Sequence, residues 1–115
     1  MVETEVIHLS DYSFGDLVLA SEGIILIDFY TAISPDCQRQ GVIIDDLAPR
    51  FRNRVQMAKM DIDKNAGISS RYKVTSTPTL ILFKDGEEQD RTVGFISEEE
   101  LISYLDAKIT ELRKK

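Results

Sequence analysis

The chain has 115 residues, of which 43% are hydrophobic and 30% are charged, which is the composition of a globular domain and not of a disordered segment. Its formal net charge of −6 argues against binding to a nucleic-acid backbone or to an anionic membrane surface. A single cysteine, Cys37, excludes a disulfide within the chain and any metal site built from several thiolates, so we expect no metal and no other cofactor.

Strand and helix patterns alternate in the first half of the chain. Residues 5–9 predict a short strand, and Ser10-Asp11 predicts the N-cap of a helix that ends at Ala20. The run from Ile24 to Tyr30 is apolar on both faces, which is typical of a strand in the middle of a sheet. A second helix begins at Ser34-Pro35-Asp36, with a kink or short break expected near Ala48 because Pro49 follows. The side chains expected to face inward from these two helices are Tyr12, Phe14, Leu17, Val18, Val42, Ile43 and Leu47.

The second half of the chain predicts three strands and two helices. Residues 55–61 and 79–84 form strand patterns on either side of a short helix at 65–72, and Asp85-Gly86 is a strong hairpin signal before a strand at 88–93. A capping-box pattern then opens the final helix at Ser97-Glu98-Glu99-Glu100. This order predicts parallel crossovers followed by an antiparallel edge, hence an α/β fold with a mixed sheet between two layers of helices.

Residues 30–37 lead from the most buried strand directly into a helix N-terminus, where free N–H groups and the helix dipole stabilise anions such as a thiolate. Here the sequence Asp28-Phe29-Tyr30-Thr31-Ala32-Ile33-Ser34-Pro35-Asp36-Cys37-Gln38 resembles the active-site segment of the thioredoxin family, which reads roughly D-F-W-A-x-W-C-G-P-C-K. The resemblance continues through Ala58–Asp63, Thr77-Pro78-Thr79 and Val93-Gly94. It implies a thioredoxin-like fold, three-layer α/β/α with about five strands and four helices, as a single domain over residues 1–115.

The departures from the family pattern fall at the reacting residues. The family uses two cysteines, of which the first attacks a substrate disulfide and the second resolves the mixed disulfide. Ser34 stands at the first position and Cys37 at the second, with Pro35 and Asp36 between them. A serine hydroxyl cannot form the sulfur–sulfur bond, so we expect no self-contained dithiol reduction and at most single-thiol exchange through Cys37.

Further roles follow from neighbouring residues and from the resemblance. Asp28 interrupts an apolar strand, so we expect it to be buried with a raised pKa. The resemblance implies that Asp28 helps to deprotonate Cys37, that Lys59 is its electrostatic neighbour, and that Pro78 is cis. The residues that the resemblance and the apolar surface assign to substrate binding are Ile33, Pro35, Asp36, Thr77, Pro78 and Gly94.

Ser34 and Cys37 also have simpler interpretations. Ser34-Pro35-Asp36 is a typical helix start, and we favour a capping role for Ser34 over a chemical one. Cys37 would lie in the first turn, where the dipole favours a thiolate but the negative charge of Asp36 opposes it, so we expect a weak nucleophile. His8 is distant from Cys37 in sequence, and we do not expect a catalytic pair.

Three hypotheses follow for the function. The first is single-thiol exchange at Cys37 with a protein or peptide that carries a disulfide or thiol, with glutathione or a thioredoxin reductase as candidate partners. The second is a non-catalytic, chaperone-like module that binds polypeptides around Ile33, Pro78 and Phe95. The third is that Ser34 was introduced into a dithiol Cys-Pro-Asp-Cys protein. We also expect a cytoplasmic monomer, since the start of the chain lacks the pattern of a signal peptide and no apolar run is long enough to span a membrane.

Overall fold

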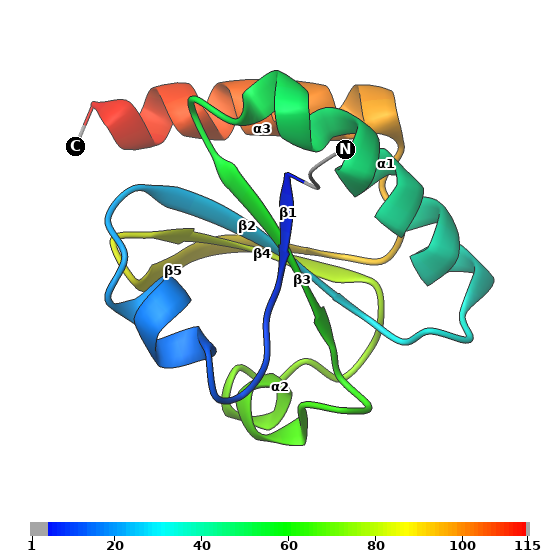
Figure 1. The fold of residues 1–115 in the computed structure, drawn as a ribbon. Coiled ribbons are helices and arrows are strands. Elements are labelled where there is room, and N and C mark those ends of the chain that lie inside the picture. The colour runs from blue at the N-terminus through cyan, green and yellow to red at the C-terminus, as the bar shows by residue number, and fades with distance from the viewer. Residues whose placement is uncertain (1–4, 115) are drawn as a thin grey trace, which may run out of the picture.

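A single five-stranded sheet forms the centre of the computed structural model, which describes residues 5–114 (Figure 1). The strand order is β1-β3-β2-β4-β5. β3 runs parallel to both β1 and β2, whereas β4 is antiparallel to β2 and to β5. The strands are β1 (Val6–His8), β2 (Ile24–Tyr30), β3 (Gln56–Asp61), β4 (Thr79–Lys84) and β5 (Glu87–Val93). The mixed α/β fold expected from the sequence is confirmed.

Within the described range, four helices cover the two faces of the sheet. Helices α1 and α3 lie on one face, and η1, a single π-helical turn, lies with α2 on the other (Figure 1). None of the described helices has both the length and the apolar character needed to cross a membrane. The helices are η1 (Gly15–Leu19), α1 (Pro35–Phe51), α2 (Ala66–Arg71) and α3 (Glu98–Arg113).

Strand β2 lies between β3 and β4 and contributes to both halves of the core. Ile27 and Phe29 face η1 and α2, whereas Leu26 faces α1 and α3. Because successive strand residues point to opposite faces, Asp28 shares the face of Leu26 and is directed toward α1. The strand register therefore places a carboxylate beneath the helix that begins at Ser34.

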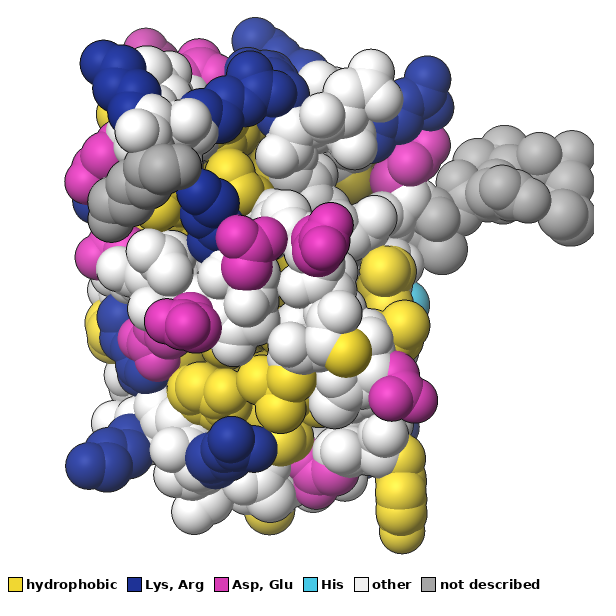
Figure 2. All heavy atoms as spheres, turned by 90° about the vertical axis from the view of Figure 1, so that its left-hand side faces the viewer, with side chains coloured by type: hydrophobic (Ala, Val, Ile, Leu, Met, Phe, Trp, Pro, Cys, Tyr) yellow, Lys and Arg dark blue, Asp and Glu magenta, His cyan; other side chains and the backbone are white. Residues whose placement is uncertain are grey.

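The surface carries charges of both signs. Figure 2 shows one side of the molecule, on which basic side chains gather toward the top and acidic ones lie across the middle, above a small group of hydrophobic side chains.

The predicted first helix is wrong in its start and in two of its inward residues. A turn follows β1 and only η1 is helical; Ser10 Oγ caps that turn by accepting the N–H of Ser13 at 3.1 Å, whereas Asp11 does not cap it. Instead, the Asp11 carboxylate accepts hydrogen bonds from the N–H groups of Gly67 and Ile68 at the start of α2. Tyr12 and Leu17 are 99% and 42% exposed, whereas Phe14 and Val18 are buried as expected. A single π-helical turn is too short to bury the wider stripe that the spacing suggested.

Helix α1 also corrects two expectations. It continues past Pro49 to Phe51 without a break. Val42 is 59% exposed, because the inward stripe passes through positions 37, 40, 44, 47, 48 and 51 and leaves residue 42 on the solvent-exposed flank of the helix. Elsewhere the predicted strand limits agree with the structure to within one residue at each end.

The β4–β5 hairpin has the turn that Asp85-Gly86 predicts, with φ of 51° and 83° at these two residues. A side chain at Gly86 would also collide with the backbone oxygen of Leu19. We expect Gly86→Ala to lower the free energy of unfolding by about 2 kcal/mol, because it combines a left-handed conformation with this clash. Urea unfolding tests this, with Gly15→Ala as the control, since a Cβ at Gly15 meets nothing within 4 Å. Equal stability of the two variants would contradict the prediction.

Candidate active site

The start of α1 is stabilised by the side chain of Ser34. Ser34 is the N-cap, and its Oγ accepts a hydrogen bond from the N–H of Cys37 at 3.2 Å. Pro35 follows at the first helical position, where its missing N–H costs nothing. Asp36 lies in the first turn and pairs with Arg39 at 2.7 Å. The Ser34 hydroxyl therefore stabilises the N-terminus of α1.

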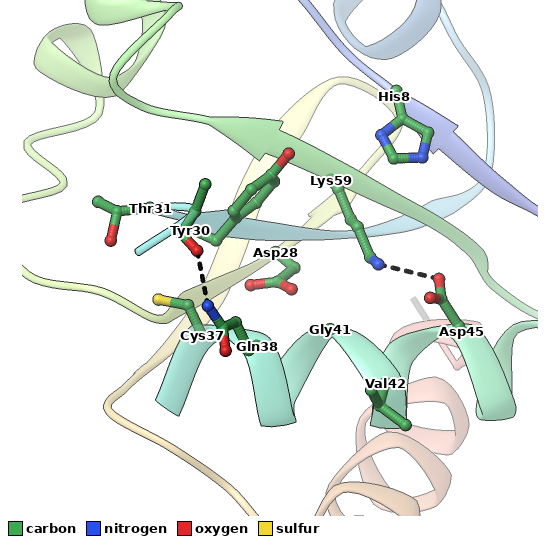
Figure 3. A pocket seen from close by; sticks show the side chains of 11 residues that line it. His8, Asp28, Tyr30, Thr31, Cys37, Gln38, Gly41, Val42, Asp45 and Lys59 are labelled. Atoms are coloured by element: carbon green, nitrogen blue, oxygen red, sulfur yellow. Dashed lines mark hydrogen bonds and ion pairs between the residues drawn. The ribbon is translucent and has the colours of Figure 1, made fainter. Parts of the chain in front are cut away.

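Cys37 lies in the first turn of α1 and faces the sheet. The residue is buried, with only 3% of its surface exposed. In Figure 3 its sulfur lies near Thr31, at one end of a pocket. The thiol is therefore shielded from a large partner at the surface. Because Cys37 lines the pocket, a group that enters the pocket can contact this residue.

This pocket has a volume of about 320 Å³ and lies between α1 and the sheet. Figure 3 shows the Asp28 carboxylate between Cys37 and Lys59, with His8 at the far end of the pocket beyond Lys59. Parallel pairing of β1 with β3 puts His8 beside Lys59, so the two ends of the pocket come from distant parts of the sequence. The lining residues are His8, Asp28, Tyr30, Thr31, Ala32, Cys37, Gln38, Gly41, Val42, Asp45 and Lys59.

Asp28 is a fully buried carboxylate, with 0% of its surface exposed. Neither of its oxygens has a hydrogen-bond partner among the described residues. Burial raises its pKa to about 7, opposed by the positive charge of Lys59 and assisted by the negative charge of Asp45. Lys59 Nζ bonds Asp45 Oδ1 at 2.9 Å and thus compensates the Asp28 charge only in part. Asp28 is therefore able to accept or release a proton close to neutral pH.

The predicted binding residues Ile33, Thr77, Pro78 and Gly94, called the rim below, lie just before α1, just before β4 and just after β5. The Thr77–Pro78 peptide bond is cis, Pro78 is buried and Thr77 is half-buried. The Gly94 N–H donates to the Pro78 carbonyl at 2.8 Å and joins the loop after β5 to the start of β4. Ile33 is 88% exposed, which leaves a large apolar side chain available to a partner.

Sequence reasoning missed Gln40, which is buried on the inner side of α1, and Asp45, which is half-exposed at the edge of the pocket. The buried Gln40 amide makes two hydrogen bonds to the backbone of Ile96. Asp45, the partner of Lys59, lies eight residues after Cys37, and helical spacing places both on the pocket side. A helix stripe drawn through Cys37 at intervals of three and four residues would have identified both.

Comparison with known proteins gives consistent matches over nearly the whole chain. A family profile described as thioredoxin matches residues 5–107. A thioredoxin of Pseudomonas aeruginosa is 32% identical over 104 residues, covering 90% of this chain and 96% of the relative. A thioredoxin of Haemophilus influenzae is 32% identical over 106 residues, covering 92% and 99%. A thioredoxin of Rickettsia bellii is 34% identical over 102 residues, covering 89% and 97%.

Proposed function

The chain belongs to the thioredoxin family, and from this premise we propose that it carries out single-thiol exchange with disulfide-bearing polypeptides through Cys37. Its lineage is that of thiol–disulfide oxidoreductases, while the site has only one sulfur. The observation that carries the proposal is that Cys37, in the first turn of α1, shares a pocket with the buried carboxylate of Asp28, which has no hydrogen-bond partner among residues 5–114.

The proposed reaction has two exchange steps. In the first, the Cys37 thiol loses its proton to the Asp28 carboxylate, and the Cys37 sulfur attacks one sulfur of the partner's disulfide. A Cys37–partner disulfide forms, the original disulfide breaks, and its second sulfur leaves as a thiolate that takes up a proton. In the second step an external thiol such as glutathione attacks the partner's sulfur and releases Cys37. A disulfide forms between the external thiol and the partner, the Cys37–partner bond breaks, and the Cys37 thiolate takes back the proton that Asp28 holds.

Ser34 removes the internal route for this second step. In a dithiol protein the neighbouring thiol resolves the adduct at a high effective concentration. Here Ser34 Oγ is a hydroxyl that accepts the N–H of Cys37, so release depends on the concentration of the external thiol. We therefore propose glutathione as the releasing partner, with a thioredoxin reductase as the alternative, and a cytoplasmic site of action where such thiols are reduced.

We expect oxidised glutathione to form a one-to-one mixed disulfide with the folded protein, because Cys37 supplies the only thiol. Intact-protein mass spectrometry detects the adduct. Cys37→Ala is the control and should give no adduct. Absence of the adduct on the folded wild-type protein would remove single-thiol exchange as the function.

The second candidate function is polypeptide binding without chemistry. It is favoured by the 88% exposure of Ile33, which keeps an apolar surface beside the shielded thiol. Binding of an unfolded polypeptide that is unchanged by Cys37→Ala would support this function, and loss of binding in that variant would argue against it.

A further inference from the structure

Gln40 is a buried polar side chain in the inward stripe of α1, which is otherwise apolar. It is 0% exposed and lies one turn before Ile44, on the side that packs against the sheet and α3. Its Oε1 accepts the N–H of Ile96 at 2.9 Å, and its Nε2 donates to the carbonyl of Ile96 at 3.2 Å. Gln40 therefore satisfies both backbone groups of one loop residue, as a neighbouring strand would.

Gln40 bonds the loop of residues 94–96, which begins at Gly94 of the rim. β5 ends at Val93, so Ile96 lies beyond the sheet ladder. A buried backbone group without a partner is costly, and an apolar residue at position 40 would leave two such groups at Ile96. Gln40 thus links the position of this loop to the first turns of α1.

Each residue of the loop from Gly94 to Ile96 has its own attachment. Gly94 donates its N–H to the carbonyl of Pro78. The guanidinium carbon of Arg39 lies over the Phe95 ring, 4.1 Å from the ring centroid. The third attachment is the pair of bonds between Ile96 and Gln40. The loop is therefore fixed to the start of β4 at one end and to α1 at the other.

We propose that Gln40 is a positioning residue that holds the loop 94–96 in the arrangement that binds a polypeptide along the rim of Ile33, Pro78 and Gly94. Gln40 itself is buried and does not touch the partner; it acts through Ile96. The inference rests on the polypeptide-facing role of this rim, which both candidate functions share.

The expected size of the effect follows from the population of the bound arrangement. A binding site that is competent only part of the time has its affinity reduced by that fraction. Loss of two hydrogen bonds is sufficient to lower the competent fraction about tenfold. We therefore expect Gln40→Met, which keeps the side-chain length and loses both bonds, to weaken polypeptide binding about tenfold.

The test uses reduced, carboxamidomethylated ribonuclease A as an unfolded polypeptide that cannot exchange disulfides. Its association with the wild type, Gln40→Met and Gln40→Glu is measured by biolayer interferometry. Amide hydrogen exchange at Ile96 is followed alongside, with the Ile109 amide in α3 reporting on global stability. We expect Gln40→Met to bind about tenfold more weakly and to exchange faster at Ile96 but not at Ile109.

Gln40→Glu keeps an acceptor for the Ile96 N–H but sets a buried oxygen against the Ile96 carbonyl, so it should bind at least as weakly as Gln40→Met; Gln40→Leu replaces Gln40→Met if that variant does not fold. Unchanged affinity despite faster exchange at Ile96 would make Gln40 a purely structural residue and overturn the inference. A wild type that does not bind the probe would also overturn it. Adduct formation with oxidised glutathione is measured separately, and its failure would remove thiol exchange without affecting this result.

Discussion

Ser34→Cys is expected to give the protein catalytic activity in thiol-dependent reduction of insulin, at least about a hundredfold above the wild type. The new thiol would stand three residues before Cys37, at the N-cap of α1. Free N–H groups and the helix dipole at that position stabilise a thiolate, which is the attacking species. Cys37 would then resolve the mixed disulfide from within the same molecule. The measurement is the rate of insulin precipitation with dithiothreitol as the reductant.

The size of this effect comes from changing a bimolecular release into an intramolecular one. An external thiol acts at its bulk concentration, whereas a neighbouring thiol held in the correct geometry acts at an effective concentration many orders of magnitude higher. The surroundings favour activity, because the buried carboxylate of Asp28 lies in the same pocket as Cys37. Full recovery would also support the interpretation that Ser34 replaces a cysteine of a dithiol parent.

Ser34→Ala is the matched control for this substitution. It removes the cap and adds no sulfur, so it should lower the free energy of unfolding by about 1 kcal/mol and leave insulin reduction at the wild-type level. If Ser34→Cys folds and stays inactive, the site has lost dithiol chemistry for reasons beyond the missing sulfur. The residues to examine would then be Asp36, whose charge opposes a thiolate, and Ile33.

The local sequence predicted most of the fold because each element carries its own short-range signal. The apolar run of β2, the Asp85-Gly86 turn and the Ser97 capping box each specify structure within a few residues. The start of the first helix was mispredicted because the Asp11 side chain makes a tertiary contact instead of a local one. Asp11 has a capping residue's chemistry but caps α2, more than fifty residues away in sequence.

For the candidate site, the sequence predicted the burial of Asp28 and the capping of α1 by Ser34, because each depends on the pattern of a single element. It could not show that Lys59 bonds Asp45, since that pair depends on how α1 crosses β3. Gln40 was missed for a related reason. The role of a glutamine on an apolar stripe can be assigned only when the structure shows that the backbone of Ile96 lies within hydrogen-bond distance of its amide.

Asp28→Asn is expected to increase the free energy of unfolding by up to about 4 kcal/mol above pH 8 and by almost nothing near pH 4. The reason is that burial raises the pKa of Asp28 from 3.8 to about 7 in the folded protein, with Lys59 opposing this only in part. Each unit of this difference corresponds to about 1.4 kcal/mol. Between these two pKa values the folded state holds a proton that the unfolded state has released. Stability due to Asp28 is therefore greatest below the lower value and falls as pH rises to about 7.

The measurement is urea unfolding of both proteins at a series of pH values from 4 to 9, expressed as the difference in unfolding free energy between variant and wild type. Groups common to both proteins cancel in that difference, so its rise between pH 4 and 7 reports on Asp28 alone. Asp106→Asn is the control, because Asp106 is an exposed carboxylate paired with Arg54 and should give a small difference with little dependence on pH. A difference for Asp28→Asn that is flat across this range would mean that the Asp28 carboxylate is solvated in the folded protein. It would then not be the neutral-pH proton acceptor that exchange at Cys37 requires.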